Sequence, residues 1–240
     1  MPATNVVQNP VAVITGGGSG IGLAMARIFA ASGYSVVITG RDAKRLQKAA
    51  ATISEKKQVA GIPCDVRNPA SVEKLFREIG KQHSVIDVLI NNAGVAHALA
   101  PVDQLSIETW KEVIDTNLTG TFLVTRAALP LMRAGGTIVN NLSVAALQPF
   151  AGMAAYNASK FGALGFTHAL REDLHKRGIR VLALLPGATD TDIWSQFWPD
   201  APKEKMISAE TVAQAVLHAV SAPANTAIEE IRIGPAAGVL

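Results

Sequence analysis

Thr15-Gly16-Gly17-Gly18-Ser19-Gly20-Ile21-Gly22 stands between the apolar run Val11–Thr15 and a segment in which apolar residues recur at helical spacing. A strand, a glycine-rich turn and a helix in this order let the backbone approach a ligand closely. The helix N-terminus presents free N–H groups and the positive end of the helix dipole, which together favour a pyrophosphate. The segment therefore predicts a dinucleotide site, with a glycine-rich turn that binds nothing as the alternative.

Short β-branched runs alternate with helical periodicity along the whole chain, which is the pattern of repeated βαβ units around a parallel sheet. The expected strands are Val11–Thr15, Ser35–Thr39, Gln58–Pro63, Asp87–Asn91, Thr137–Leu142, Arg180–Pro186 and Ile231–Ile233. Asn68 and Ser208 are expected to cap helices. We predict a doubly wound α/β domain (Rossmann fold) over residues 1–240, with strand order 3-2-1-4-5-6-7 and the site at the carboxyl ends of the strands.

The composition excludes several classes of protein. Of 240 residues, 49% are hydrophobic and 17% charged, with a formal net charge of +3, so the chain is expected to fold around a core. Its single cysteine, Cys64, excludes a disulfide framework and a thiolate-rich metal site. Neither a basic secretory signal nor a sufficiently apolar membrane span is recognisable, so we expect a soluble, cytoplasmic protein.

Two groups of polar residues invite other functions. Basic residues cluster in one short segment, at Arg41, Lys44, Arg45, Lys48, Lys56 and Lys57. Aromatic stacking residues are missing there, so we expect a solvated helix face beside a phosphate site and no nucleic-acid binding. His168, Glu172 and His175 share a helical face, which we also interpret as solvated, and we expect no catalytic metal.

A second constellation is Tyr156-Asn157-Ala158-Ser159-Lys160, in which the four-residue offset puts the phenol and the ammonium on one helical face. Ser143 lies thirteen residues earlier, where the fifth expected strand ends. Tyrosine titrates near pH 10, so a proton relay near neutrality needs a shift of about three units, or roughly 4 kcal/mol. An ammonium about 4 Å away supplies an effect of that order. Taken alone, the pair is ordinary helix surface.

In combination these motifs resemble the short, single-domain branch of the short-chain dehydrogenases/reductases over nearly the whole chain. The shared order comprises the glycine motif, Asn91-Asn92-Ala93-Gly94, Asn117, Ser143, the Tyr156 and Lys160 pair, and Pro186-Gly187. The resemblance implies that Tyr156 is the general acid/base and that Ser143 holds the substrate oxygen. It also implies that Lys160 binds the nicotinamide ribose and lowers the Tyr156 pKa, and that Asn117 holds a water linking Lys160 to solvent.

The resemblance further implies a set of cofactor contacts along the carboxyl edge of the sheet. These are Gly16, Gly18, Ser19, Gly20, Ile21, Gly22, Thr39, Arg41, Asp65, Val66, Asn92, Ala93, Gly94, Tyr156, Lys160, Pro186, Gly187 and Thr191. Asp65 and Val66 are expected to end the third strand beside the adenine, although Asp65 could equally cap the following turn.

The end of the second expected strand predicts NADP(H) as the cofactor. NAD-selective enzymes place a carboxylate about twenty residues beyond the glycine motif, and by resemblance Gly40 occupies that position. Arg41 follows it and can pair with a 2′-phosphate. Asp42 is the competing signal, and we interpret it as a helix N-cap. Ser19 departs from one NADP pattern, in which a basic residue stands there.

The segment 190–208 is expected to be a substrate loop. Trp194, Phe197 and Trp198 form either a lid over a hydrophobic substrate, which we favour, or a subunit contact. The opposite wall is expected at Gln148, Phe150 and Met153. Asp190 and Asp192, which flank Thr191, are expected to cap the segment that follows.

The expected function is reversible hydride transfer between NADP(H) and a small or medium carbonyl compound or its alcohol, with reduction as the physiological direction. A first alternative is a 3-oxoacyl-(acyl-carrier-protein) reductase, with Arg133 and Arg177 as contacts for an acidic carrier. A second is a catalytically silent cofactor-sensing protein. The resemblance suggests a homotetramer, in which the Tyr156 helix and the preceding helix pack across one two-fold axis and the seventh strand across another.

Overall fold

Seven parallel strands form one sheet in the computed structural model, which describes residues 9–53 and 59–238. The strands are β1 (Val11–Thr15), β2 (Ser35–Gly40), β3 (Val59–Pro63), β4 (Val88–Asn91), β5 (Thr137–Asn141), β6 (Arg180–Pro186) and β7 (Glu230–Ile233). Their order is β3-β2-β1-β4-β5-β6-β7, which confirms the predicted order. From β1 the strands are added toward one edge of the sheet, up to β3, and from β4 they are added toward the other edge. The crevice in which parallel sheets bind ligands is therefore expected between β1 and β4.

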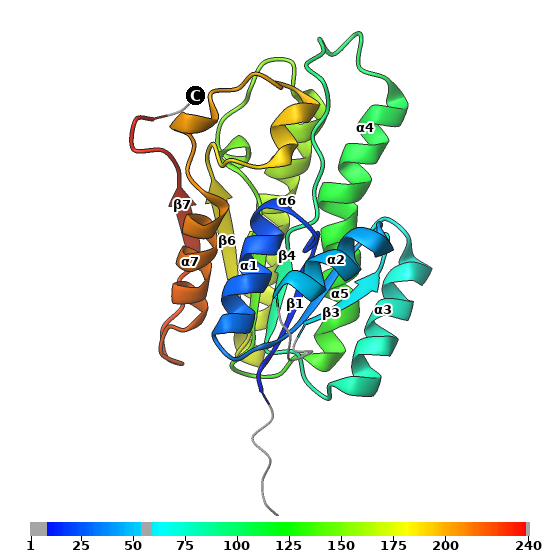
Figure 1. Cartoon of the computed structure of the whole chain (residues 1–240), viewed down its shortest axis with the longest axis vertical. Coiled ribbons are helices and arrows are strands. Elements are labelled where there is room, and N and C mark those ends of the chain that lie inside the picture. Colours follow the sequence, from blue (N-terminus) through cyan, green and yellow to red (C-terminus); the bar gives the residue numbers. More distant parts are fainter. Residues whose placement is uncertain (1–8, 54–58, 239–240) are drawn as a thin grey trace, which may run out of the picture.

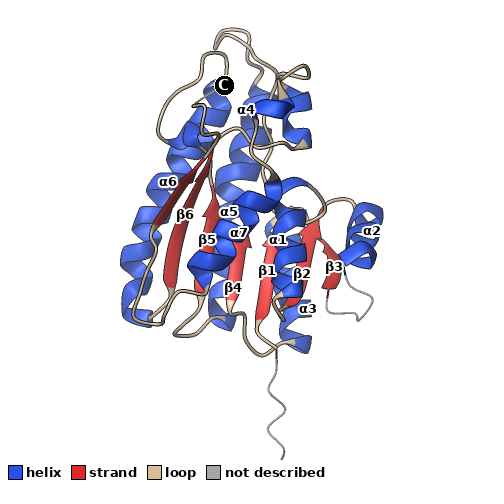
Figure 2. Cartoon of the chain, turned by 60° about the vertical axis from the view of Figure 1, so that its left-hand side comes forward, coloured by secondary structure: helices blue, strands red, loops and turns tan. Residues whose placement is uncertain are grey.

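The helices cover both faces of this sheet (Figures 1 and 2). They are α1 (Gly20–Ala31), α2 (Ala43–Ile53), α3 (Pro69–Gln82), α4 (Ile107–Ile114), α5 (Gly120–Ala128), α6 (Ala154–Leu174) and α7 (Ala209–Val220). In Figure 2, α1 and α7 lie in front of the strands, α2 lies to the right of β3, and α4 lies above the strands. No helix among the described residues is long and apolar enough to cross a membrane.

The core has two main parts because side chains alternate between the faces of each strand. Ala12 and Ile14 of β1 pack with α1 and α7, whereas Val11 and Val13 pack with α3, α5 and α6. Phe29 of α1 is fully buried in the first part. Burial of a side chain of this size stabilises the fold by roughly 1.5–3 kcal/mol relative to exposure, so the two cores hold the sheet rigid under the site.

Side-chain caps begin several helices as the sequence predicts. The Asn68 side chain accepts a hydrogen bond from the Ser71 N–H at 3.1 Å at the start of α3, and Ser208 Oγ accepts one from the Thr211 N–H at 3.1 Å at the start of α7. Asp42 Oδ1 likewise accepts from the Arg45 N–H at 3.0 Å at the start of α2. The interpretation of Asp42 as a cap is therefore confirmed.

Strand ends differ from the prediction by a residue or two. The third strand ends at Pro63, so Asp65 and Val66 lie in the loop after it, where a turn begins. The predicted first residue of that strand, Gln58, and the basic residues Lys56 and Lys57 lie outside the described residues. A π-helical turn, Asp115–Thr119, which periodicity did not predict, joins α4 to α5.

Candidate active site

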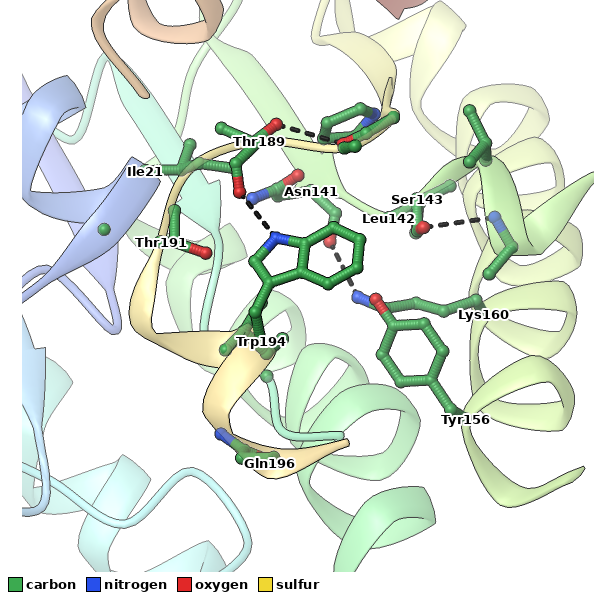
Figure 3. A pocket seen from close by; sticks show the side chains of 18 of the residues that line it. Ile21, Asn141, Leu142, Ser143, Tyr156, Lys160, Thr189, Thr191, Trp194 and Gln196 are labelled. Atoms are coloured by element: carbon green, nitrogen blue, oxygen red, sulfur yellow. Dashed lines mark hydrogen bonds between the residues drawn. The ribbon is translucent and has the colours of Figure 1, made fainter. Parts of the chain in front are cut away.

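One pocket of about 970 Å³ opens at the carboxyl ends of the strands. Its walls come from the glycine-rich turn, the loop after β4, the end of β5, the first turn of α6, and the segments that follow β6 and β7. Figure 3 shows Trp194 on one side of this pocket, with Tyr156 and Lys160 opposite. The structure thus brings together residues that the sequence places in distant segments.

The first turn of α1 faces the pocket without a side-chain cap. Ser19 precedes the helix but makes no cap hydrogen bond, and the first turn contains no acidic residue. By contrast, α3, α4 and α7 all begin with a side chain that accepts from a backbone N–H. Ser19, Gly20 and Ile21 line the pocket. Free N–H groups at a helix N-terminus fit a pyrophosphate, so these residues can hold a dinucleotide.

The glycines shape this turn. Gly16 and Gly20 have positive φ values of 64° and 51°, which side-chain-bearing residues rarely adopt. A methyl group at Gly22 would overlap the Gly16 carbonyl oxygen and the Asn92 side chain. Gly18 and Gly22 support the turn from outside the pocket wall, whereas Gly16 and Gly20 line it.

Asparagine side chains lock the carboxyl ends of the three central strands. Asn92 Nδ2 donates to the Thr15 carbonyl oxygen at 2.9 Å and to that of Gly16 at 3.2 Å. Asn141 Nδ2 in turn donates to Asn92 Oδ1 at 2.7 Å. Asn92, Ala93 and Gly94 line the pocket, so this network fixes the floor on which a cofactor would lie.

Tyr156 and Lys160 project from the first turns of α6 into the pocket (Figure 3). Lys160 Nζ lies 5.5 Å from the centroid of the Tyr156 ring and donates to the Asn141 carbonyl oxygen at 3.2 Å. Ser143 also lines the pocket, and its Oγ accepts from the Ala145 N–H at 3.1 Å. A phenol, a hydroxyl and an ammonium therefore converge on one space.

Burial dominates the electrostatics of this pair. It lowers the pKa of Lys160 to about 8. It also raises the pKa of Tyr156 above its usual 10, and a hydrogen bond with Ser143 acts in the opposite direction. The shift of the Tyr156 pKa is thus opposite in direction to the one expected, because removing the phenolate from water outweighs its hydrogen bond with Ser143.

Asn117 lies in the π-helical turn behind the pocket wall. Its Oδ1 accepts from the Val95 N–H at 2.9 Å, while its Nδ2 donates to the Val95 carbonyl oxygen at 2.9 Å and to Ser159 Oγ at 3.0 Å. The side chain therefore ties the loop after β4 to α6 at Ser159, three residues from Tyr156 and one from Lys160. Its predicted water-holding role stays a prediction.

At the other end of the pocket, Arg41 and Arg45 line the wall. Arg41 lies 3.7 Å from the carboxylate of Glu112 on α4. Asp65 accepts from the Arg67 N–H at 3.0 Å and forms an ion pair with the Arg67 guanidinium at 2.7 Å, which lowers the pKa of Asp65. Asp65 therefore caps its turn, the alternative that the sequence left open. Asp65, Val66 and the buried Thr39 lie outside the pocket wall.

The substrate loop forms the outer wall. Trp194 packs against Phe197 and Trp198, with ring centroids 5.0 and 6.1 Å apart, and all three line the pocket. Phe150 and Met153 lie in the wall as well, but Gln148 does not. The expected capping by Asp190 and Asp192 is wrong, because Thr191 precedes the 3-10 turn Asp192–Gln196 and that turn has no side-chain cap hydrogen bond. Asp190 instead pairs with Lys203 at 3.5 Å and Asp192 with Arg45 at 3.1 Å.

Several wall residues have no signal in the sequence. Pro186, Gly187 and Thr191 were expected, but the pocket also includes Leu99, Gln196, Arg232, Gly234 and Pro235. Gln196 Oε1 accepts from the Ala96 N–H at 2.9 Å and so joins the substrate loop to the loop after β4. Such contacts between distant segments could be found only from the folded structure.

The remaining polar residues that the sequence singled out lie elsewhere. His168 Nε2 is 3.0 Å from Glu230 Oε1 on β7, and His175 Nδ1 contacts the Glu172 carbonyl oxygen at 2.7 Å. Within residues 9–53 and 59–238, no three His, Cys, Asp or Glu side chains are grouped to hold a metal ion. Arg133 and Arg177 precede β5 and β6, so they lie at the amino ends of the strands, away from the pocket.

Comparisons with known proteins agree with this geometry. The family model described as short chain dehydrogenase matches residues 10–202. Sulfoacetaldehyde reductase 2 of Chromohalobacter salexigens is 34% identical, with 95% of each chain covered. A short chain dehydrogenase from Burkholderia cenocepacia, solved with NADP, is 32% identical with a TM-score of 0.85, over 95% of this chain and 98% of that one. A 3-ketoacyl-(acyl-carrier-protein) reductase from Brucella melitensis, solved with NADH, is 27% identical with a TM-score of 0.86, over 95% and 97% of the two chains.

Proposed function

The chain belongs to the short-chain dehydrogenase family of oxidoreductases, and on that premise we propose that it interconverts a small or medium carbonyl compound and its alcohol with NADP(H). One observation carries the proposal. The uncapped first turn of α1 and the Tyr156, Lys160 and Ser143 side chains line the same pocket. A dinucleotide held by that turn and a carbonyl group held by those side chains would share one space.

In the proposed reaction Tyr156 donates its hydroxyl proton to the carbonyl oxygen during reduction. Its raised pKa keeps the hydroxyl protonated near neutrality, which suits a proton donor. Ser143 holds the same oxygen by a hydrogen bond, and Asn117 holds a water that carries protons from solvent. Lys160, whose pKa is about 8, is mostly protonated at pH 7 and places its charge beside the phenol. The bound nicotinamide would supply the hydride.

Replacing Tyr156 with phenylalanine tests the proton relay. Tyr156→Phe should abolish turnover, followed as loss of nicotinamide absorbance, while the affinity for the cofactor survives because only the transferable proton is lost. Lys160→Ala should weaken both, since it removes a ribose contact as well as a charge. If Tyr156→Phe retained more than about a tenth of wild-type turnover, another group would have to be the proton donor.

The preference for NADP(H) rests on Arg41, which lines the pocket beyond a strand that ends in Gly40 instead of a carboxylate. Asp42 caps α2 through its Oδ1, which supports the interpretation that it is not the ribose-binding carboxylate of an NAD-selective enzyme. Arg41→Ala should lower kcat/KM for NADPH by a factor that corresponds to a free energy of about 2 kcal/mol or more, which is the scale of charge-assisted phosphate contacts. It should leave kcat/KM for NADH nearly unchanged. A wild-type enzyme that prefers NADH would contradict this assignment.

The pocket walls favour an apolar substituent next to the carbonyl group. The wall of the pocket that Tyr156 lines also includes the apolar side chains Trp194, Phe197, Trp198, Phe150 and Met153. A panel of ketones, oxo-acids and oxo-thioesters would identify the substrate class. The carrier-protein alternative loses its proposed contacts, because Arg133 and Arg177 lie at the opposite ends of the strands. Equal rates on free and carrier-bound thioesters would remove that alternative. A much higher rate on the carrier-bound thioester would restore it.

We also propose a homotetramer. Phe122 of α5 and Phe161 of α6 are 42% and 46% exposed, and large exposed apolar side chains on adjacent helices indicate a covered face. The seventh strand is an edge strand of the sheet, open to a second contact. Sedimentation at micromolar concentration should give a tetramer, and a monomer under those conditions would refute it.

A further inference from the structure

Arg45 connects the two halves of the active site. It lies in the first turn of α2, where its Nε donates to the Gly18 carbonyl oxygen at 3.3 Å. One of its terminal nitrogens donates to Asp192 Oδ2 at 3.1 Å. Asp192 begins a 3-10 turn in the substrate loop, 147 residues further along the chain. A single guanidinium thus contacts both the glycine-rich turn and the loop that covers the pocket.

The loop around Asp192 is seated on the glycine-rich turn at a second point. A methyl group built on Gly20 would lie 3.2 Å from Thr191 Cγ2, so these two residues are packed closely. Further along the loop, Gln196 is bonded to the Ala96 N–H at 2.9 Å. The loop therefore crosses the groove in which α1 would hold a pyrophosphate, and the Arg45–Asp192 pair anchors the start of that crossing.

Arg45 also lies where a 2′-phosphate would be bound. In this fold the pyrophosphate sits at the N-terminus of the first helix, and the adenosine ribose lies toward the end of the second strand. Gly18 belongs to the first of these segments, and α2 follows the second, so Arg45 spans the interval between them. Both Arg45 and Asp192 line the pocket, and both are open to solvent.

We propose that Asp192 holds Arg45 in the cofactor-free protein and that the 2′-phosphate of NADP(H) replaces the carboxylate on Arg45. This inference rests on the proposed NADP(H) preference. Carboxylate and phosphate both bind a guanidinium through its N–H donors, and two anions on one guanidinium repel each other. NADH has no 2′-phosphate, so it leaves the pair intact. Arg45 is then a specificity-determining residue, and Asp192 is the positioning residue that responds to the type of cofactor.

Binding measurements without turnover test the exchange. Trp194 and Trp198 line the pocket, so quenching of tryptophan fluorescence during titration with NADPH or NADH reports the Kd of each. Asp192→Asn should tighten NADPH binding about two- to fivefold, the range expected for losing an exposed competing ion pair, and leave NADH binding unchanged. Arg45→Gln should weaken NADPH binding about tenfold. In the Arg45→Gln background, Asp192→Asn should have no effect.

Matched charge changes nearby control for net charge. Lys48→Gln on α2 and Asp200→Asn, later in the substrate loop than Asp192, remove the same charges at exposed positions outside the pocket wall, and neither should change the ratio of the two Kd values. Arg45→Lys keeps the charge but loses the planar fork, and it should recover part of the NADPH affinity.

The outcomes separate the exchange from the proposed cofactor preference. If wild-type protein binds NADH more tightly than NADPH, the proposed cofactor is wrong and the exchange fails with it. Wild type could prefer NADPH while Asp192→Asn weakens NADPH binding, leaves it unchanged, or changes the Kd of both cofactors by the same factor. In each of these cases only the exchange of Asp192 for the 2′-phosphate is refuted. An Arg45→Gln variant with normal NADPH affinity would also overturn it, while leaving Arg41 as the determinant of cofactor choice.

Discussion

Replacing Lys160 with methionine should stabilise the protein measured without cofactor while weakening its activity. Lys160 is only 6% exposed, and Nζ donates to the Asn141 carbonyl oxygen at 3.2 Å. Burial lowers its pKa from 10.5 to about 8. Because the pKa in the folded state is below the unfolded value, the charged lysine destabilises the folded state at pH values below 8, and this penalty disappears as the pH rises toward 10.5.

The magnitude follows from the shift. One pKa unit corresponds to about 1.4 kcal/mol, so the penalty near pH 7 is about 3 kcal/mol. Methionine has a similar length and no charge, but it leaves the Asn141 carbonyl without its donor, at a cost of about 1 kcal/mol. Lys160→Met should therefore raise the free energy of unfolding by about 2 kcal/mol at pH 7. The gain should shrink by about 1 kcal/mol between pH 7 and pH 9.

Urea denaturation of the cofactor-free proteins at pH 7 and pH 9 measures this effect. Other titrating groups are common to wild type and variant, so they cancel in the difference between the two free energies of unfolding. Lys48→Met, at an exposed position on α2, is the matched control. The difference in free energy of unfolding between this variant and wild type should be the same at both pH values. The reasoning fails if the Lys160→Met difference is constant between pH 7 and pH 9, or if it grows with pH.

Three further predictions concern residues around the pocket. In Gly22→Ala the new methyl group would overlap the Gly16 backbone, so this variant should not fold stably. In Gly18→Ala the atom nearest to the new methyl group is 3.5 Å away, so Tm should change by no more than a few degrees. The buried Asn91 side chain donates two hydrogen bonds of 2.9 Å to neighbouring side chains. Asn91→Leu should therefore lower the free energy of unfolding in urea by about 2–3 kcal/mol. Gln196→Ala removes the bond to Ala96 and should raise KM for the carbonyl substrate severalfold while leaving the Kd for NADPH unchanged.

Local patterns account for the part of the structure that the sequence predicts well. Strand order follows from alternating β-branched runs and helical periodicity, and the caps Asn68, Asp42 and Ser208 follow from the residues just before each helix. The convergence of Ser143, Tyr156 and Lys160 in the pocket follows from their motif, and the structure places all three in one wall.

Long-range contacts account for most of what the sequence did not predict. The Arg45–Asp192 pair joins residues that share no pattern, so the sequence indicates only a local role for each, as a surface charge or a cap. The direction of the Tyr156 pKa shift depends on burial by neighbouring segments, which spacing along one helix does not report. The π-helical turn at Asp115–Thr119 matches no pattern in the sequence and lies between the end of α4 and the start of α5.

The open first turn of α1 makes the stability of this protein depend on what binds there. Helix caps such as those of α3, α4 and α7 each contribute about 1 kcal/mol, and α1 has no such side chain. A ligand at a hundred times its Kd adds about 2.7 kcal/mol to the free energy of unfolding. A dinucleotide bound at this turn would therefore lower both the unfolded fraction and the rate at which proteases cleave it, compared with the free protein.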